Sequence, residues 1–145
     1  MSETIIDAAS ATDASAVLSL LERSGLPTDG WLRHLEETIV ARRDGRVVGS
    51  AALEVYDEGA LLRSVAVEAD ARGSGIGRQM TLAAIARAAD LGVPAMFLLT
   101  TTAEHFFPKF GFEPCARADV PSSVRESVEF TSACPASAVV MRKLF

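Results

Sequence analysis

Hydrophobic and polar positions in the middle of the chain predict paired strands. Residues 40–56 read VARRDGRVVGSAALEVY and contain Asp44-Gly45, a residue pair typical of a tight hairpin. A second turn at 57–59 leads into the apolar segment 60–67. Residues 95–101 are too apolar for an edge strand, so they predict a strand buried on both faces. Further strands are expected at 4–10, 112–117 and 138–145.

Segments in which apolar residues recur at helical spacing alternate with these strands. Val17, Leu20 and Leu21 recur on one face of a helix expected over 12–24, which Gly25 ends. Further helices are expected over 28–39, 77–92, 103–111 and, as a turn, 121–129. The element order predicts an α/β fold, in which a mixed sheet carries helices on both faces and a crossover helix joins the strands at 60–67 and 95–101.

Composition narrows the function classes. The chain has 145 residues, which favours one domain over 1–145, and a net charge of −5, which does not favour nucleic-acid binding. It shows neither a membrane-spanning apolar run nor a signal peptide, so a cytoplasmic protein without a membrane partner is expected. The two cysteines are expected to be reduced, and the two histidines lack metal-ligand spacing, so no metal site is predicted.

The segment RGSGIGR, residues 72–78, is the main chemical signal in the chain. It lies between a strand and a helix, where unpaired N–H groups and the helix dipole favour a phosphate group. Glycines allow close backbone approach, and Arg72 and Arg78 can add charge. The pattern is neither a Walker loop nor the dinucleotide fingerprint, and a plain strand-to-helix turn is the alternative.

The segment LLRSVAVEADARGSGIGRQM, with its R-x-x-G-x-G pattern, resembles the acyl-CoA-binding motif of the GNAT superfamily of N-acetyltransferases, and AEHFFPKFGF resembles a later segment of that family. The resemblance implies acetyl-CoA as cofactor, a splayed GNAT-type central sheet, and an acetyl group transferred to an amine. It also implies that acetyl-CoA is bound by residues of the strand, the loop and the later helix: Val65, Ala66, Val67, Arg72, Gly73, Ser74, Gly75, Ile76, Gly77, Arg78, Phe106 and Phe107.

The sequence departs from the family at both usual acid–base positions. Phe107 stands where the family often has Tyr, and Leu61 corresponds to the position where it often has Glu. A phenyl ring has no proton to donate. Glu54 and Tyr56 are candidate substitutes, and a bulge at Arg63-Ser64 is expected to aim a backbone N–H at the thioester carbonyl.

The acceptor is expected to be a small, amino-acid-like amine. Arg63 interrupts an apolar strand, and it forms either a structural ion pair with an acid such as Glu54 or Glu129, or a fork for a substrate carboxylate. Arg117, Arg125 and Cys134 are further candidate substrate-binding residues.

The C-terminal third resembles a GNAT branch found with arsenic-resistance functions, which implies an organoarsenical amino acid as acceptor. It also resembles glutamate-type amino-acid N-acetyltransferases, which are the alternative. A non-catalytic acyl-CoA-binding module and a lysine acetyltransferase that acts on proteins are further alternatives, and a homodimer is possible because dimers are frequent in the superfamily.

Overall fold

The computed structural model describes residues 3–101, 103–133 and 137–145. Its strands form a seven-stranded sheet in the order β1-β2-β3-β4-β5-β7-β6, in which every pair is antiparallel except β4 and β5. The strands are β1 (Thr4–Ala8), β2 (Thr38–Arg43), β3 (Arg46–Tyr56), β4 (Gly59–Val67), β5 (Ala95–Thr100), β6 (Glu113–Pro114) and β7 (Val139–Leu144).

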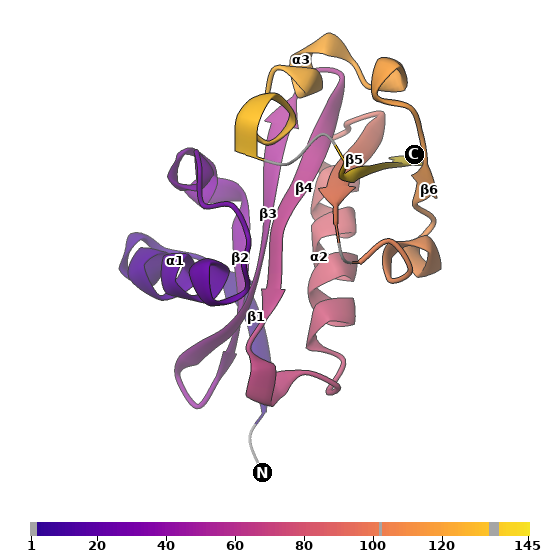
Figure 1. Cartoon of the computed structure of the whole chain (residues 1–145). Coiled ribbons are helices and arrows are strands. Elements are labelled where there is room, and N and C mark those ends of the chain that lie inside the picture. The colour runs from indigo at the N-terminus through magenta and orange to yellow at the C-terminus, as the bar shows by residue number, and fades with distance from the viewer. Residues whose placement is uncertain (1–2, 102, 134–136) are drawn as a thin grey trace.

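Helices cover both faces of the sheet, as the sequence predicted. Helix α1 (Ala14–Arg23) lies on one face and α2 (Ile76–Asp90) on the other (Figure 1). Val17, Leu20 and Leu21 of α1 are buried in a cluster with Trp31, whereas Met80 of α2 belongs to the core on the opposite face. Helix α2 is the crossover between β4 and β5.

Several predicted helices are shorter or of another type than expected. The segment expected at 28–39 is a 3₁₀ helix at Trp31–Glu37, because Gly30 has a φ of 70° and His34 leaves helical geometry. The helix expected at 103–111 is reduced to a 3₁₀ turn, Phe107–Phe110, which contains a proline at its start and ends at Gly111 with a φ of 91°.

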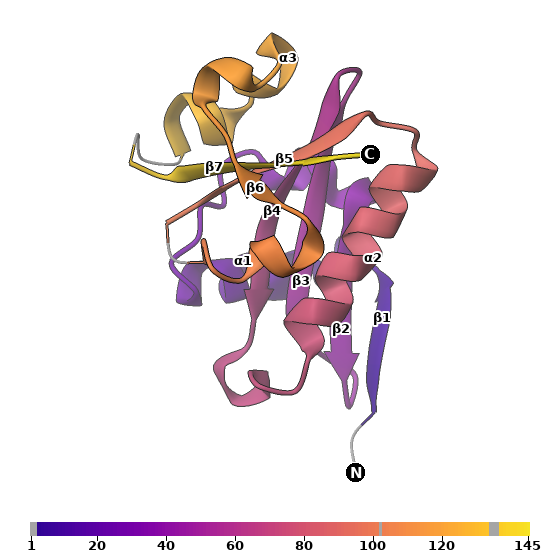
Figure 2. The same cartoon turned by 90° about the vertical axis from the view of Figure 1, so that its right-hand side faces the viewer.

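The C-terminal third also differs from the prediction. The strand expected at 112–117 is limited to the two residues of β6. The helical turn expected at 121–129 becomes α3 (Ser122–Arg125), followed by a π-helical turn at Glu129–Ala133. Helix α3 lies at the end of the molecule away from the N-terminus (Figure 2). Among the described residues, no helix is both long and apolar enough to cross a membrane.

Strands β4 and β5 separate soon after they meet. Their parallel pairing consists of Ala60 with Met96 and Leu61 with Phe97, and it does not continue along the described part of either strand. The predicted splay is therefore confirmed. The edge of β4 that faces β5 is left open over residues 62–67, where a ligand can take the place of a neighbouring strand.

Candidate functional site

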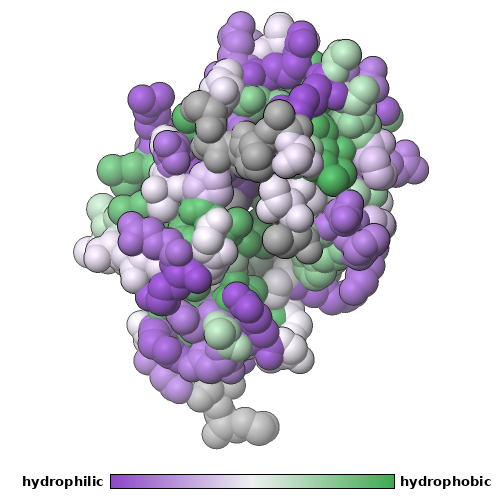
Figure 3. Space-filling model, viewed as in Figure 1, coloured by the Kyte–Doolittle hydropathy of each residue, from purple (hydrophilic) through white to green (hydrophobic). Residues whose placement is uncertain are grey.

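A cavity of about 560 Å³ lies where β4 and β5 diverge. Hydrophobic residues are exposed in the middle of the face shown in Figure 3, which is viewed as in Figure 1. The described residues that line the cavity come from segments 24–27, 62–67 and 98–101 and, from other elements, include Arg72, Gly77, Phe106 and Glu129. The cavity therefore runs from the glycine loop, past the open edge of β4, to the start of the C-terminal π-helical turn.

A bulge interrupts β4 inside this cavity. Ser50 pairs with Ala66 and Ala52 with Arg63, so β4 holds one more residue than β3 over this interval. Ser64 takes up the difference in a left-handed conformation, with a φ of 59°. The Ser50 hydroxyl donates a hydrogen bond to the Ser64 carbonyl at 2.7 Å and holds the bulge in place. The bulge predicted from the sequence is confirmed.

The glycine loop presents a row of unpaired N–H groups. Gly73 and Gly75 have φ values of 84° and 83°, a conformation that non-glycine residues seldom adopt. The N–H groups of residues 73–78 donate no hydrogen bond within the described part of the chain; the next one, that of Gln79, donates to the Gly75 carbonyl. Since α2 starts at Ile76, its dipole adds positive potential at this loop.

Side chains around the loop divide into those that reach the cavity and those that do not. Arg72 lines the cavity, and its Nε donates to the Val67 carbonyl at 3.2 Å. Arg78 is exposed and does not line the cavity. Ile76 is buried in the core beside Met80, so only its backbone N–H can contact a ligand. Ser74 Oγ donates to the Ala71 carbonyl and stabilises the turn.

Two aromatic rings form the wall opposite β4. Phe106 and Phe107 both line the cavity, and their ring centroids lie 5.1 Å apart in an edge-to-face arrangement. A Cβ atom at Gly77 would meet Val67 Cγ2 at 3.6 Å and Phe106 Cζ at 3.7 Å, so a side chain longer than a methyl group would enter the cavity. Phe107 supplies shape and apolar surface, since it has no group to donate a proton.

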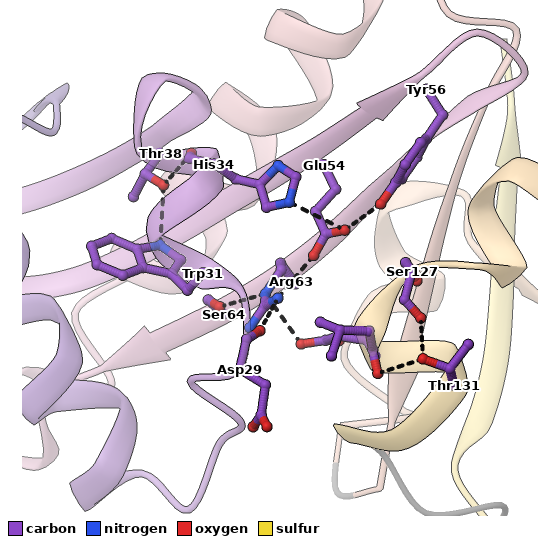
Figure 4. A network of polar contacts seen from close by, with 12 residues as sticks. Asp29, Trp31, His34, Thr38, Glu54, Tyr56, Arg63, Ser64, Ser127 and Thr131 are labelled. Atoms are coloured by element: carbon purple, nitrogen blue, oxygen red, sulfur yellow. Dashed lines mark hydrogen bonds and ion pairs between the residues drawn. The ribbon is translucent and has the colours of Figure 1, made fainter.

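Arg63 is the centre of a buried polar network (Figure 4). Its Nη1 donates to Glu54 Oε2 at 2.8 Å and to the Asp29 carbonyl at 2.7 Å. Its Nη2 donates to the Pro27 carbonyl at 3.2 Å, and its Nε lies 3.1 Å from Ser64 Oγ and 3.2 Å from Glu129 Oε2. The geometry therefore favours the structural ion pair that the sequence left open, with both predicted acids as partners.

Glu54 and Tyr56 do not belong to the described lining of the cavity. The Tyr56 hydroxyl donates to Glu54 Oε1, and burial together with this hydrogen bond raises the pKa of Tyr56 well above its ordinary value. His34 Nε2 lies 3.4 Å from the same oxygen, and burial lowers the pKa of His34. The structure thus places both candidate acid–base groups in the network around Arg63.

The remaining candidate substrate residues do not meet at the cavity. Arg117 lies over the ring of Phe130, 5.6 Å from its centroid, and Arg125 is exposed on α3. Neither belongs to the described lining of the cavity. Cys134 lies outside the described residues. Within the residues that the structure describes, no group of three or more His, Cys, Asp or Glu residues is arranged to hold a metal ion.

Sequence reasoning missed two parts of the cavity. The loop at 24–27, between α1 and the Trp31 segment, lines the cavity, although Gly25 had signalled only the end of a helix. Glu129 was named only as a possible partner of Arg63, yet it is 4% exposed and also lines the cavity. Both parts are brought to β4 by tertiary contacts that no local pattern encodes.

A family model described as an acetyltransferase (GNAT) domain matches residues 34–114. This match covers β2 to β6, including the splayed strands, the bulge and the glycine loop. The chain belongs to the GNAT acetyltransferase family.

Curated relatives are identical to this chain at about a third of the aligned positions. It is 33% identical over 123 residues, 79% of its length, to an amino-acid acetyltransferase of Aeromonas salmonicida (strain A449), and 34% identical over 131 residues, 84% of its length, to that of Pasteurella multocida (strain Pm70). It spans 28% and 30% of these two proteins. One domain over residues 1–145 stays a prediction.

Solved structures support the same GNAT fold. N-acetylglutamate synthase from Neisseria gonorrhoeae, complexed with coenzyme A and N-acetyl-glutamate, superposes with a TM-score of 0.84 at 20% identity, over 99% of this chain and 35% of that one. A Mycobacterium tuberculosis protein in complex with CoA superposes with a TM-score of 0.83 at 23% identity, over 97% of this chain and 99% of that one. The predicted GNAT-type fold is confirmed.

Proposed function

We propose that this GNAT domain transfers the acetyl group of acetyl-CoA to the amine of a small, amino-acid-like acceptor. The observation that carries the proposal is the row of unpaired N–H groups at residues 73–78, which opens onto a cavity between two diverging strands. The curated relatives are named amino-acid acetyltransferases, which supports the acceptor class.

The residues present fit acetyl-CoA along the whole cavity. The N–H groups of 73–78 and the guanidinium of Arg72 would hold the pyrophosphate. The open edge of β4 over Val65–Val67 would pair with the pantetheine arm as an additional strand would, against the rings of Phe106 and Phe107. Acetyl-CoA supplies the activated acetyl group.

The bulge at Ser64 lies roughly 10 Å along β4 from Val67, at a rise of about 3.3 Å per residue. A backbone N–H turned out of the sheet at the bulge would stabilise the oxyanion that forms when the acceptor amine attacks the thioester. Phe107 cannot act as an acid. Most of the acceleration of acetyl transfer is therefore expected to come from positioning of the amine against the thioester and from stabilisation of the oxyanion.

Acetyl-CoA binding and turnover test this proposal together. Isothermal titration with acetyl-CoA is expected to show one site, and incubation with a panel of amino acids is expected to release free CoA thiol and give N-acetylated product by mass spectrometry. Tight binding without turnover of any amine would favour the non-catalytic module instead, which the apolar residues Leu61 and Phe107 would suit. Absence of binding would overturn the proposal.

Narrower predictions are tested in the same assay. An organoarsenical amino acid belongs in the amine panel, because that acceptor stays a prediction while the relatives found are named for amino acids. Acetylation of protein lysines, the third alternative, would appear as modified peptides when candidate proteins replace the amines. A homodimer and a cytoplasmic location also stay predictions; light scattering of the purified protein tests the first.

A further inference from the structure

Ser64 has an unusual backbone conformation for its place in the chain. Among the described residues, Asp44 and Ser64 are the residues other than glycine with a positive φ, at 55° and 59°. Asp44 lies in the hairpin turn with Gly45, where such values are ordinary. Ser64 lies inside β4, is 6% exposed and lines the cavity. Strained residues of this kind are concentrated at functional sites, which points to a role for Ser64 in the cavity.

Neighbouring side chains hold both the carbonyl and the hydroxyl of Ser64. The Ser50 hydroxyl donates to the carbonyl at 2.7 Å. Arg63 Nε donates to Ser64 Oγ at 3.1 Å and also lies 3.2 Å from Glu129 Oε2 (Figure 4). Arg63 is itself fixed, because its side chain is fully buried and its Nη1 donates to Glu54 Oε2 at 2.8 Å. The position of Ser64 Oγ is therefore set by the protein before any ligand binds.

The hydroxyl proton of Ser64 has no acceptor within the part of the chain that the structure describes. The Arg63 Nε–H group occupies one lone pair of Oγ, so the O–H group is left to donate. A hydroxyl that accepts from a cationic donor becomes a better donor itself, because the two hydrogen bonds polarise each other. A hydroxyl this deeply buried needs an acceptor, and a ligand in the cavity that Ser64 lines can supply one.

We propose that the Ser64 hydroxyl donates a hydrogen bond to the thioester carbonyl oxygen of bound acetyl-CoA. This inference rests on the proposed function, in which the thioester lies at the bulge of β4. The hydroxyl and the bulge N–H then form a pair of donors for the negative charge that develops on this oxygen during acetyl transfer. Ser64 keeps its proton and forms no covalent bond, so it is a catalytic residue through its hydrogen bond alone.

Alanine and glycine at position 64 are the matched pair of variants for the test. Both remove the hydroxyl, but glycine adopts a positive φ freely, whereas alanine keeps the strain of the wild type. At saturating acetyl-CoA, kcat is expected to fall about a hundredfold to a thousandfold in both Ser64→Ala and Ser64→Gly. Isothermal titration is expected to show an unchanged Kd for acetyl-CoA. Ser15→Ala, exposed on α1, is the control and should keep the wild-type kcat.

A structural role for Ser64 gives a different pattern of rates. If the residue only shapes the bulge, Ser64→Gly keeps the wild-type kcat and Ser64→Ala alone loses it. That result would overturn the inference, because the hydroxyl is absent from both variants.

Infrared difference spectra of bound acetyl-CoA, isotopically labelled at its carbonyl carbon, test the hydrogen bond without turnover. Donation from Ser64 is expected to lower the carbonyl stretching frequency in the wild type, and both variants should lose the same part of this shift. Identical band positions in all three proteins would contradict the hydrogen bond. If the band shifts as expected but no amine is acetylated, the hydrogen bond remains and it is the proposed function that fails.

Discussion

Glu54 and Arg63 form an ion pair with Nη1 and Oε2 2.8 Å apart, and their side chains are 1% and 0% exposed. They lie on adjacent strands, β3 and β4, next to the bulge. A charged pair at this depth is favourable only because each partner is hydrogen-bonded. Removal of Arg63 would leave Glu54 buried with only the Tyr56 hydroxyl and His34 as partners, so this part of the cavity is sensitive to the loss of Arg63.

The first prediction concerns the replacement of Arg63 by Met. The variant keeps the volume of the side chain but leaves Glu54 and Glu129 buried without their cation, which is expected to cost about 3–5 kcal/mol of unfolding free energy. Urea denaturation at neutral pH measures this loss. Arg125→Met is the control, since Arg125 is exposed and should cost less than about 0.5 kcal/mol.

The opposite result for Arg63→Met would favour the alternative role of Arg63, which is to bind a substrate carboxylate. If Arg63→Met kept the stability of the wild type and raised only the KM of the acceptor, Arg63 would bind the substrate carboxylate rather than hold the network together.

The second prediction separates backbone strain from cofactor binding at the glycine loop. Gly75 and Gly92 have φ values of 83° and 76°, and a Cβ atom at either meets open space. Valine at either position should therefore cost a similar amount of stability, about 1–3 kcal/mol. Only Gly75→Val is expected to weaken acetyl-CoA binding, by at least about tenfold or about 1.4 kcal/mol, in isothermal titration.

Circular dichroism of both variants provides the control for folding. Equal acetyl-CoA affinity in Gly75→Val and Gly92→Val, at equal melting temperature, would show that the cofactor does not use the N–H groups of this loop.

The third prediction uses salt to identify a charge contact. Arg72→Ala is expected to weaken acetyl-CoA binding several-fold at low ionic strength, because Arg72 lines the cavity at the loop. The difference from the wild type should shrink as salt is added, since screening weakens the contact that the wild type makes. Arg78→Ala, outside the described cavity lining, should have the smaller effect. A larger loss from Arg78 than from Arg72 would move the phosphate to the exposed side of α2.

The fourth prediction is a pH dependence of stability at Asp13. Arg42 donates to both Asp13 carboxylate oxygens at 2.7 Å, and this pairing, with the Ser10 N–H at 2.8 Å, holds the pKa of Asp13 well below its ordinary value of 3.8. The stabilisation is present in full above pH 3.8, the value for the unfolded chain, and is lost as pH falls toward the lower pKa of the folded state.

Asp13→Asn is therefore expected to lose about 1.5–3 kcal/mol of unfolding free energy at pH 7, and its deficit should narrow progressively below pH 3.8. Urea denaturation across this pH range measures the deficit. Asp7→Asn is the control, because Asp7 is 58% exposed and lies 3.5 Å from Arg42, so it should cost less than about 1 kcal/mol. A deficit for Asp13→Asn that stays constant with pH would contradict the ion pair as its cause.

The sequence alone determined the parts of this protein that depend on local patterns. The alternation of hydrophobic and polar residues, together with the turn residues, predicted the hairpin around Asp44-Gly45. The run of apolar residues at 95–101 predicted a central strand. The glycines at 73–77 predicted a loop at the start of a helix, because glycine tolerates the positive φ that Gly73 and Gly75 adopt. A charged residue in an apolar strand, Arg63, signalled a buried partner or a ligand but could not choose between them.

Tertiary structure decided the rest. The partners of Arg63 come from positions 54 and 129 and from the loop before Trp31, and only folding brings these segments to one point. The same is true of the cavity, whose walls are distant in sequence, and of Glu129 as a charged group within it. The ability of a glycine to adopt a positive φ follows from its own chemistry, whereas the left-handed Ser64 and the charge balance of the buried site depend on which distant residues surround them.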